Sequence, residues 1–376
     1  MVTVDKGIDF PRKDISNILL IQLGDIGDVV LTLPCIRALR ENFPKANIIV
    51  AVREKAGELI EDCPWSTGVI SVNKEKRSLG KAIAYQKDFF LRLRKFHFDL
   101  VIDLRTGTRG AILTFLTGAR HRIGYYGDGG RWRNRIFTHL APNEYEPGQY
   151  VGEYYLNLLI TYNLRTKNVR PELHVPRERR KRAAALLREH GVPLDRPLIA
   201  LQPFSLWQYK EWGIEKYVQL INWITWKYKF PVVLTGSPNE RERAVEIQNR
   251  CAENVYNLIG KTSIGMFSAI LEACQVFVGA DSSGMHISGA VGTPTVSIFG
   301  PSSPVSWAPR GKQHLVVQKD FSCVPCRQKG CEGSEVSRCL EALTFDEVKP
   351  IVRKQLERIK VSGGTRQDAA SLLLRD

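Results

Sequence analysis

The sequence predicts an α/β protein made of two doubly wound domains, and three observations support this fold class. Short apolar segments alternate with longer segments whose apolar residues recur at helical spacing, the pattern of parallel strands covered by helices on both faces. The alternation occurs twice in 376 residues, a length that suits about two domains. A polar, basic stretch, YNLRTKNVRPELHVPRERRKR, separates the two sets. We expect domains over residues 1–172 and 173–361, followed by a disordered tail over 362–376.

The expected strands and helices follow the same order in both halves. In the first half, apolar runs and helical periodicity predict strands at residues 17–22, 47–52, 99–104 and 120–125 and helices at 28–42 and 79–96. In the second half they predict strands at 197–203, 231–236, 275–280 and 294–300 and helices at 214–228, 239–251 and 263–274. Open parallel sheets bind ligands at the carboxyl ends of their strands, so the turns after these strands are where chemistry is expected.

The composition favours an acidic partner. The formal net charge of +15 suits nucleic acid, an anionic membrane surface or a phosphorylated substrate, although a merely basic surface explains it as well. The opening segment MVTVDKGIDFPRKD lacks the apolar core of a signal peptide, and no apolar run reaches the roughly 20 residues that span a bilayer. We therefore expect a cytoplasmic protein, at most peripheral on the inner face of a membrane, with mostly reduced cysteines.

The turn after the first strand, LGDIGDVV, contains two glycines and two carboxylates. Gly24 and Gly27 permit a tight backbone, and Asp28 falls in the first turn of the helix that follows. A carboxylate there stabilises the helix terminus by about 1 kcal/mol. The alternative is a general base exposed at the edge of the sheet. A dinucleotide site is disfavoured, because G-x-G-x-x-G is absent and phosphates would meet Asp25 and Asp28.

The second half contains the features of an anion site. In VGADSSGMH, Ser282, Ser283 and Gly284 present hydroxyls and backbone N–H groups at a helix N-terminus, which suits a diphosphate. Asp281 is either a helix cap or the partner of a sugar hydroxyl. His286 lies within the first turns and reaches the same ligand, unless it is a partly buried core histidine.

Two neighbouring turns add polar groups to the same edge. Ser205 and Lys210 follow one strand, and Lys210 supplies a compact positive charge for a phosphate. Glu240 follows the next strand and is suited to accept hydrogen bonds from ribose hydroxyls. The alternatives are a surface lysine and a carboxylate that stabilises a helix terminus. Together these turns predict a nucleotide-diphosphate site in the second domain, facing the carboxylate Asp28 of the first.

The order of these motifs resembles that of one known family. GDIGDVVLTLP, DLRTGTRGAILTFLTGARHRIGY, KEWGIEKY, LTGSPNERE and DSSGMHISGAVGTPTVSIFGPSSP follow one another as in the lipopolysaccharide heptosyltransferases, glycosyltransferase family 9, over residues 18–358. The resemblance implies a GT-B architecture, with an N-terminal acceptor-binding domain and a C-terminal donor-binding domain facing a central cleft. It also implies inverting transfer of heptose from ADP-heptose to the lipopolysaccharide inner core, without a catalytic metal.

The resemblance also assigns roles by position. The family's catalytic aspartate falls on Asp28, its phosphate-binding lysine on Lys210 and its ribose carboxylate on Glu240. Its donor-site helix motif falls on residues 281–286, with serine at 282 where threonine is common. Asp28 would take the proton of the acceptor hydroxyl, while Lys210, Ser205 and the helix start at 282–284 would stabilise the departing ADP. Asp25 is expected to be solvated; the alternative is that its like charge tunes Asp28.

Arginines are concentrated after the strand expected at 99–104. The lipopolysaccharide core carries carboxylates and phosphates, which arginine binds with paired hydrogen bonds, although a solvated basic face is the alternative for each. The cluster comprises Arg105, Arg109, Arg120, Arg122, Arg131, Arg133 and Arg135. We assign acceptor binding to Arg105, Arg109, Arg120 and Arg122, with the last two, which flank the strand at 120–125, as first choices.

Four of the eight cysteines lie close together in CVPCRQKGCEGSEVSRCL. A C-x2-C pair followed by two further cysteines is typical of zinc or iron–sulfur ligand sets, although the later spacing is irregular for a zinc ribbon. The resemblance requires no metal, so Cys323, Cys326, Cys331 and Cys339 are only candidate ligands of a structural metal. The remaining cysteines read as small buried apolar residues: Cys35, Cys63, Cys251 and Cys274.

The sequence leaves two alternative functions. One is a transferase of the same fold with a different nucleotide-sugar donor, because these motifs do not determine the base and sugar contacts. The other is a basic nucleic-acid-binding protein, but no known nucleic-acid motif occurs, and basic residues are not interleaved with aromatic ones. We expect ADP-heptose, lipopolysaccharide core and the inner membrane surface as partners, and no nucleic acid. The segment EGSEVSRCL favours an acceptor like that of heptosyltransferase III, which already carries heptose.

Overall fold

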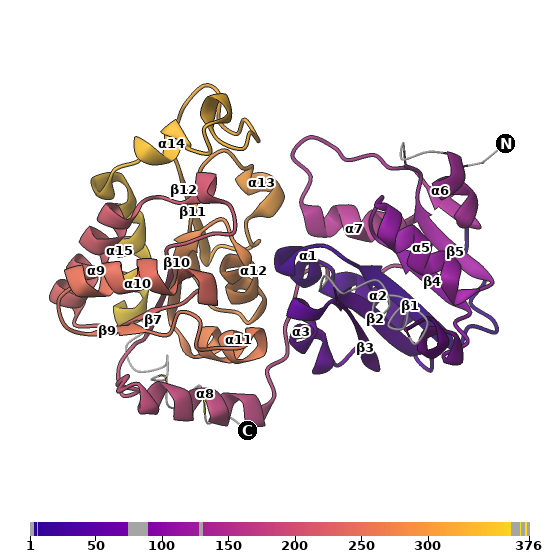
Figure 1. Cartoon of the computed structure of the whole chain (residues 1–376), viewed down its shortest axis with the longest axis horizontal. Helices are drawn as coiled ribbons and strands as arrows, with labels where there is room; N and C mark the ends of the chain where they lie inside the picture. The colour runs from indigo at the N-terminus through magenta and orange to yellow at the C-terminus, as the bar shows by residue number, and fades with distance from the viewer. Residues whose placement is uncertain are drawn as a thin grey trace, which may run out of the picture. The chain divides into compact units, whose positions relative to one another are not determined.

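The chain forms two compact units, Met1–Pro171 and Glu172–Asp376. The structure is a computed structural model that describes residues 4–5, 7–73, 89–127, 131–361, 369 and 373. Figure 1 colours the first unit from indigo to magenta and the second through orange to yellow. Most of the expected tail lies outside the described residues. Its two described residues, Ala369 and Leu373, are helical and buried.

The first unit contains a six-stranded parallel sheet in the order β3-β2-β1-β4-β5-β6. The strands are β1 (Asn17–Gln22), β2 (Asn47–Arg53), β3 (Gly68–Val72), β4 (Leu100–Asp103), β5 (His121–Tyr125) and β6 (His139–Ala141). This is the order of a doubly wound sheet, and it reverses between β1 and β4. Ligands bind such sheets beyond the carboxyl ends of the strands, at the reversal.

The second unit repeats this arrangement with the order β12-β11-β10-β7-β8-β9. Its strands are β7 (Ile199–Gln202), β8 (Val232–Leu234), β9 (Val255–Asn257), β10 (Val276–Ala280), β11 (Thr295–Phe299) and β12 (His314–Gln318). Here the order reverses between β7 and β10. Each unit is therefore expected to bind a ligand beside its first and fourth strands.

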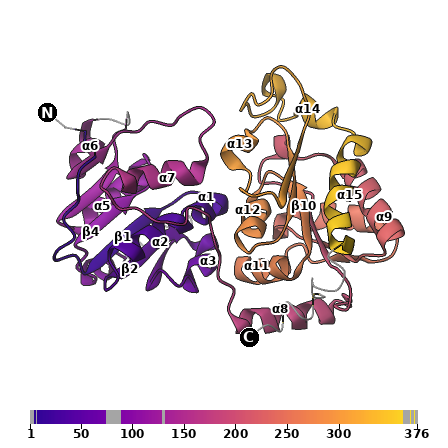
Figure 2. The same ribbon diagram turned by 180° about the vertical axis from the view of Figure 1, so that it is seen from behind.

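Helices connect the strands and cover the sheets. Those of the first unit are α1 (Ile26–Leu31), α2 (Leu33–Asn42), α3 (Glu58–Glu61), α5 (Thr108–Thr117), α6 (Arg131–Ile136) and α7 (Val151–Ile160). Those of the second are α8 (Arg177–Glu189), α9 (Ile214–Tyr228), α10 (Arg241–Arg250), α11 (Ile264–Ala273), α12 (Ser283–Ala290), α13 (Pro304–Trp307), α14 (Arg338–Glu341) and α15 (Phe345–Val361). Figures 1 and 2 place α9, α10 and α15 on one side of the second sheet and α11 and α12 on the other.

Single helical turns of the 3-10 type follow several strands and carry some of the site residues. They are η1 (Glu54–Ala56), η2 (Gln208–Lys210), η3 (Pro238–Glu240) and η4 (Cys331–Gly333).

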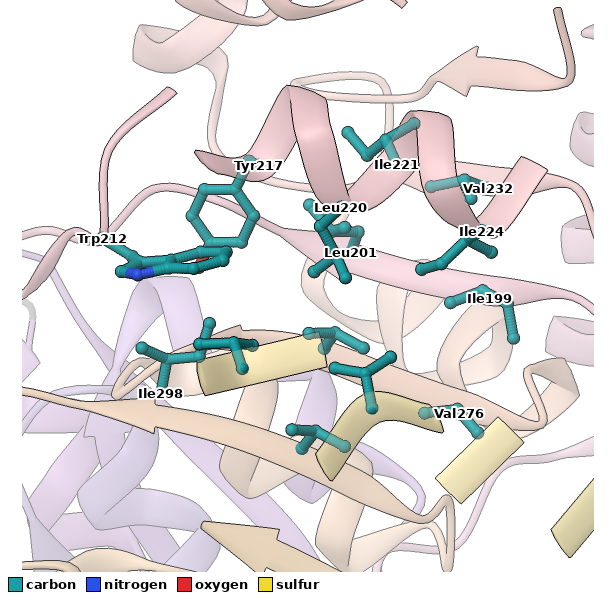
Figure 3. Packing of buried hydrophobic residues seen from close by; sticks show 14 of the residues in the cluster. Ile199, Leu201, Trp212, Tyr217, Leu220, Ile221, Ile224, Val232, Val276 and Ile298 are labelled. Atoms are coloured by element: carbon teal, nitrogen blue, oxygen red, sulfur yellow. The ribbon is translucent and has the colours of Figure 1, made fainter. Parts of the chain in front are cut away.

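The core of the second unit explains why its central strands read as continuous apolar runs. Ile199 and Leu201 of β7 are fully buried beneath α9, whose inward face includes Tyr217, Leu220 and Ile224, as Figure 3 shows. Burying each such side chain stabilises the fold by about 1.5–3 kcal/mol. Trp212 closes one end of this cluster, and its buried indole Nε1–H donates to the carbonyl of Leu343 at 2.7 Å.

The predicted central strands and helices are confirmed, with two differences. The helix expected at 28–42 is interrupted at Thr32, because Pro34 has no N–H to donate to the preceding turn. The helix expected at 79–96 lies partly outside the described residues, and its described part is helical over 89–95. In the described part of the chain, no helix has the length and apolar character needed to cross a bilayer.

Candidate functional site

The expected site residues of the first unit lie where the strand order reverses. Asp28 follows β1, and Arg105 follows β4, the strand that pairs with β1. Their side chains meet: Arg105 Nη1 donates to Asp28 Oδ2 at 3.0 Å. We call Asp28, Arg105 and Tyr155 the carboxylate site, because Tyr155 of α7 joins the pair with a 2.7 Å hydrogen bond from its Oη to Asp28 Oδ1.

The Asp28 carboxylate is largely buried and well supplied with donors. Its side chain is 13% exposed. Besides Arg105 and Tyr155, it accepts the backbone N–H of Asp25 on Oδ2 at 2.8 Å, in the capping box of α1. The hydrogen bond expected of a helix-capping Asp28 is therefore present. The second carboxylate oxygen remains turned toward Tyr155, so the contact does not exclude a chemical role.

Gly24 is required by this geometry. A Cβ at position 24 would overlap Asp28 Oδ2 and lie 2.5 Å from Arg105 Nη1. The Gly24 N–H donates to Gln22 Oε1 at 3.0 Å, which ties the loop back to the end of β1. Because Gly24 has no side chain, the Asp28 carboxylate and the Arg105 guanidinium can meet directly above its backbone.

The backbone of Arg105 is held from both sides by buried charged residues. Its N–H donates to Asp103 Oδ1 at 3.1 Å, and its carbonyl accepts from Arg133 Nη2 at 2.9 Å. Burial raises the pKa of Asp103 to about 7, although the Arg105 N–H and the charge of Arg133 oppose this shift. Arg133 belongs to the arginine cluster for which acceptor contact or a solvated face was the expectation. It is neither exposed nor solvated, because its side chain is buried and also bonds the Tyr125 carbonyl at 2.8 Å.

Asp25 is exposed, as expected of a solvated side chain. Its Oδ1 also pairs with Arg53 Nη1 at 2.5 Å, near the end of β2. The ion pair partly compensates the charge of this second carboxylate, which would otherwise oppose the charge of Asp28.

The other expected acceptor arginines do not join the carboxylate site. Arg109 is exposed in the first turn of α5. Arg120 precedes β5 and Arg122 lies near its beginning, so both are at the amino ends of the strands, opposite the edge that carries Asp28. Arg122 makes local contacts, donating to the carbonyls of Ile136 and Ala119, each at 2.6 Å.

In the second unit, a lysine and an aspartate meet at the corresponding reversal of strand order. Lys210 ends η2 after β7, and Asp281 follows β10. Lys210 Nζ lies 2.6 Å from Asp281 Oδ2, and the two side chains are 20% and 4% exposed. We call these two residues and the start of α12 the anion site. The carboxylate holds the ammonium in place, while part of the lysine stays open to a ligand.

The start of α12 supplies the backbone donors expected for an anion. Ser282 is the N-cap of α12, followed by Ser283 and Gly284. The buried Ser282 hydroxyl has no hydrogen-bond partner among the described residues. A Cβ at Gly284 would overlap the Gln202 side chain at the end of β7, so glycine lets the helix start lie against this strand. His286 is buried in α12, with its ring 6.1 Å from that of Trp307.

Ser205 and Glu240 lie in the adjacent turns after β7 and β8. The Ser205 N–H donates to Glu211 Oε1 at 3.1 Å, and its hydroxyl accepts from the N–H of Trp207 at 3.3 Å. Glu240 Oε2 accepts the N–H of Ser237 at 2.7 Å, in the capping box of η3. Burial raises the pKa of Glu240, although the hydrogen bonds from Ser237 lower it.

The four clustered cysteines do not form a metal site. Within the described residues, no group of three or more His, Cys, Asp or Glu side chains is arranged to hold a metal ion. Cys323 is exposed, whereas Cys339 lies in α14 and packs into the core, so the thiols lie at different depths. All eight cysteines are free thiols; the remaining four are buried as expected except Cys251, which is partly exposed.

Two residues that contribute contacts to the candidate sites were not predicted from the sequence. Tyr155 is separated from Asp28 by 127 residues, and nothing near it in the chain marks it as a partner of a carboxylate. Glu211, which accepts the Ser205 N–H and pairs with Arg243 at 2.5 Å, was also overlooked. Its position immediately after Lys210 was the available signal.

Comparison with known proteins finds relatives over most of the chain. Residues 87–336 match the model of glycosyltransferase family 9 (heptosyltransferase). The chain is 28% identical over 289 residues to lipopolysaccharide heptosyltransferase 3 of Escherichia coli, covering 75% of this chain and 83% of the relative.

Solved structures agree on the fold. A glycosyltransferase family 9 protein of Veillonella parvula DSM 2008 has a TM-score of 0.81 at 21% identity, covering 91% of this chain and 98% of that chain. The E. coli ADP-heptose lipopolysaccharide heptosyltransferase II has a TM-score of 0.74 at 20% identity, covering 92% and 99%. These likenesses confirm the α/β fold class with two doubly wound, Rossmann-like domains, the pair that makes up the GT-B architecture.

Proposed function

The chain belongs to glycosyltransferase family 9, and from this premise we propose that it transfers heptose from ADP-heptose to the inner core of lipopolysaccharide, with inversion at the anomeric carbon. We assign donor binding to the second unit and acceptor binding to the first. The observation that carries the proposal is the anion site: a lysine held by a buried aspartate beside a helix N-terminus, at the reversal of strand order.

The donor is held by complementary groups along three strands. Lys210 and the start of α12 bind the diphosphate, and the Ser282 hydroxyl supplies a further donor. Glu240 follows β8, which is the second strand of its unit in chain order. Doubly wound domains carry at this place the acidic residue that binds a ribose hydroxyl. The names of the relatives support this choice, because one of the similar structures is an ADP-heptose transferase.

Asp28 is the general base in this proposal. It removes the proton of an acceptor hydroxyl, and the hydroxyl oxygen attacks the anomeric carbon of the heptose. The bond between that carbon and the β-phosphate oxygen breaks, and its electron pair leaves with ADP. Lys210 and the N–H groups of α12 stabilise the negative charge that the departing ADP gains.

Arg105 and Arg109 are the acceptor-binding arginines in this proposal. Both follow β4, on the edge that carries Asp28, and both are exposed. Arg120 and Arg122 are assigned no part in it, because they lie at the amino ends of the strands.

We further propose that the protein works on the cytoplasmic face of the inner membrane. An α5–α6 face, formed by Ile112, Phe115 and Trp132, exposes three large apolar side chains on neighbouring helices of the first unit. Arg109 and Arg135 are exposed on the same two helices. Apolar side chains flanked by arginines suit an anionic bilayer, and α5 begins beside the carboxylate site that would receive the sugar of a lipid-anchored acceptor.

The test is ADP release from ADP-heptose in the presence of deacylated inner-core acceptors of increasing length. Wild type, Asp28→Asn and a matched control, Asp195→Asn at an exposed loop position, are compared, and product mass is checked. We expect Asp28→Asn to lose at least about 100-fold in kcat, as expected for a general base, while it still binds ADP. Lys210→Met should instead weaken ADP binding.

Each other outcome has a defined meaning. Equal turnover by wild type and Asp28→Asn would reduce Asp28 to a helix cap. Turnover only with another nucleotide sugar would keep the transferase and replace the donor. Transfer that requires an acceptor already carrying heptose would identify the acceptor as that of a heptosyltransferase III.

A further inference from the structure

Most of the hydrogen-bond acceptor positions of the Asp28 carboxylate are already occupied. Its two oxygens offer about four acceptor positions. Oδ2 uses two of them, for the Asp25 N–H and for Arg105 Nη1, and Oδ1 uses one for the Tyr155 hydroxyl. One acceptor position, on Oδ1, is left for an incoming hydroxyl. If Asp28 takes a proton it loses its charge, so its ion pair with Arg105 has to be given up.

Of the three groups that bond Asp28, Arg105 is the one whose side chain can move away. The Asp25 donor is a backbone group at a helix terminus, and Tyr155 is buried, with its pKa raised well above the usual value by burial, so it remains a hydroxyl donor. The Arg105 side chain, in contrast, is 43% exposed. Its backbone is fixed by Asp103 and Arg133, so the guanidinium can swing while the loop stays in place.

We propose that Arg105 restrains Asp28 until an anionic group of the acceptor draws the guanidinium away. This inference rests on the proposed transferase function. Phosphate and carboxylate groups bind arginine through paired hydrogen bonds, which compete directly with the single bond that Arg105 makes to Asp28. Arg105 is then a positioning residue that reads the charge of the acceptor, and Tyr155 keeps the carboxylate oriented after Arg105 leaves.

The arrangement protects the donor from water. Without an acceptor, Arg105 keeps the Asp28 carboxylate in an ion pair and so holds it back from water. Once the restraint is removed, Asp28 can take a proton from water, whose oxygen attacks the anomeric carbon. The bond from that carbon to the phosphate oxygen breaks, and ADP leaves with the electron pair, giving free heptose. Loss of Arg105 should therefore cause hydrolysis of the donor.

The experiment compares Arg105→Gln with the wild type in two assays. In the first, ADP release from ADP-heptose is measured without acceptor; we expect an increase of about tenfold in Arg105→Gln, the size of one lost charge-assisted bond. In the second, transfer is measured to acceptors with and without their phosphate groups. Wild type should prefer the phosphorylated acceptor in kcat as well as KM, and Arg105→Gln should lose the preference in kcat. Arg188→Gln, at an exposed position in α8, is the matched control.

A double variant shows whether the effect runs through Asp28. Adding Asp28→Asn to Arg105→Gln should return hydrolysis to the wild-type level or lower. The inference is overturned if the single variant, shown to be folded, has unchanged hydrolysis, or if the double variant keeps the increase. These results are distinguishable from failure of the proposed function, since that failure appears as absence of transfer by the wild type.

Discussion

Asp28 and Glu240 occupy the same local position in the two units. Each is the third residue of a helical turn that follows a strand, and each accepts the backbone N–H of the residue that caps the turn. A glycine precedes each cap, and a Cβ on Gly24 or Gly236 would overlap the carboxylate. The cap bond uses one oxygen of the side chain, so a capping role and a ligand role are compatible on the same residue.

Replacing Gly24 by alanine tests whether activity and stability depend on this close packing. The new methyl group would displace both Asp28 and Arg105, since it overlaps Oδ2 of the first and lies 2.5 Å from Nη1 of the second. We expect kcat to fall by about 100-fold, the loss typical of a misplaced catalytic group, and the free energy of unfolding to fall by about 1–3 kcal/mol. Steady-state kinetics and urea unfolding measure the two effects.

Gly107→Ala is the control for this variant. Gly107 lies in the same unit just before α5, has φ of −76°, and a Cβ there would meet nothing within 4 Å. Its kcat should stay within about twofold of the wild type, and its unfolding free energy within about 1 kcal/mol. Comparable activity losses in the two variants would show that the loops after β1 and β4 are sensitive to any added side chain, rather than to displacement of Asp28.

At the residue scale, the sequence indicates groups that lie in the turn after an apolar strand. Lys210 and Asp281 were both singled out in this way, and the structure brings their side chains together, while the roles assigned to them stay predictions. Tyr155 could not be found, since its role depends on the packing of α7 against the loop after β1. Arg133 was grouped with the surface arginines because a sequence does not distinguish a surface arginine from one buried among carbonyl groups.

At the scale of elements, the strands that sequence analysis did not predict are the edge strands of the sheets. β3, β6, β9 and β12 lie at the four edges, and β3, β9 and β12 are only partly buried. A central strand is covered on both faces and must be apolar throughout, whereas an edge strand is not. The apolar run that reveals β1 or β10 is therefore absent from VYN or HLVVQ.

The first turn of α15 carries a charge whose contribution depends on pH. Lys319 Nζ donates to Glu347 Oε1 at 2.7 Å, and the N–H and hydroxyl of Thr344 donate to Oε2, each at 2.8 Å. These contacts hold the pKa of Glu347 at about 2, below its value of roughly 4.3 in an unfolded chain. The stabilisation is therefore present above about pH 4.3 and is lost as the pH falls toward 2.

Glu347→Gln should remove this pH dependence. Glutamine can still accept from Thr344, but it has no charge to attract Lys319. We expect the variant to have a lower Tm than the wild type at pH 7, and the two Tm values to converge as the pH falls from about 4.3 toward 2. Glu357→Gln removes the same charge from an exposed position of α15 and serves as control. An equal, pH-independent deficit in both variants would contradict the role of the Glu347 contacts.

At the scale of the whole molecule, the excess of positive charge is unevenly distributed. Residues 89–137 contain ten lysines and arginines but three aspartates, so this segment supplies a large share of the chain's net charge of +15. Of these aspartates, Asp103 is buried and Asp99 accepts the backbone N–H groups of Ser16 and Asn17. The exposed arginines of α5 and α6 therefore act with little compensation from this segment, beside the α5–α6 face.

Binding to vesicles tests whether this face meets a membrane. Wild type should cosediment with vesicles of phosphatidylglycerol and phosphatidylethanolamine, and bind weakly to phosphatidylcholine alone or at high salt, because its arginines need anionic lipid. Phe115 is 64% exposed, and inserting it would remove its ring from water. Phe115→Ser should therefore weaken binding by about tenfold, the effect of roughly 1.5 kcal/mol of lost burial.

The control is Trp226→Ser, because Trp226 is 74% exposed on α9 of the second unit, outside the α5–α6 face. It removes a larger apolar side chain and should leave vesicle binding unchanged. Equal losses in the two variants would mean that any exposed aromatic ring promotes adsorption, and the face would have no special part. If Phe115→Ser instead abolished self-association of the protein and left vesicle binding intact, the face would be a contact between copies of the chain. Only a loss confined to Phe115→Ser and to anionic vesicles connects the apolar side chains and the arginines to a single lipid surface.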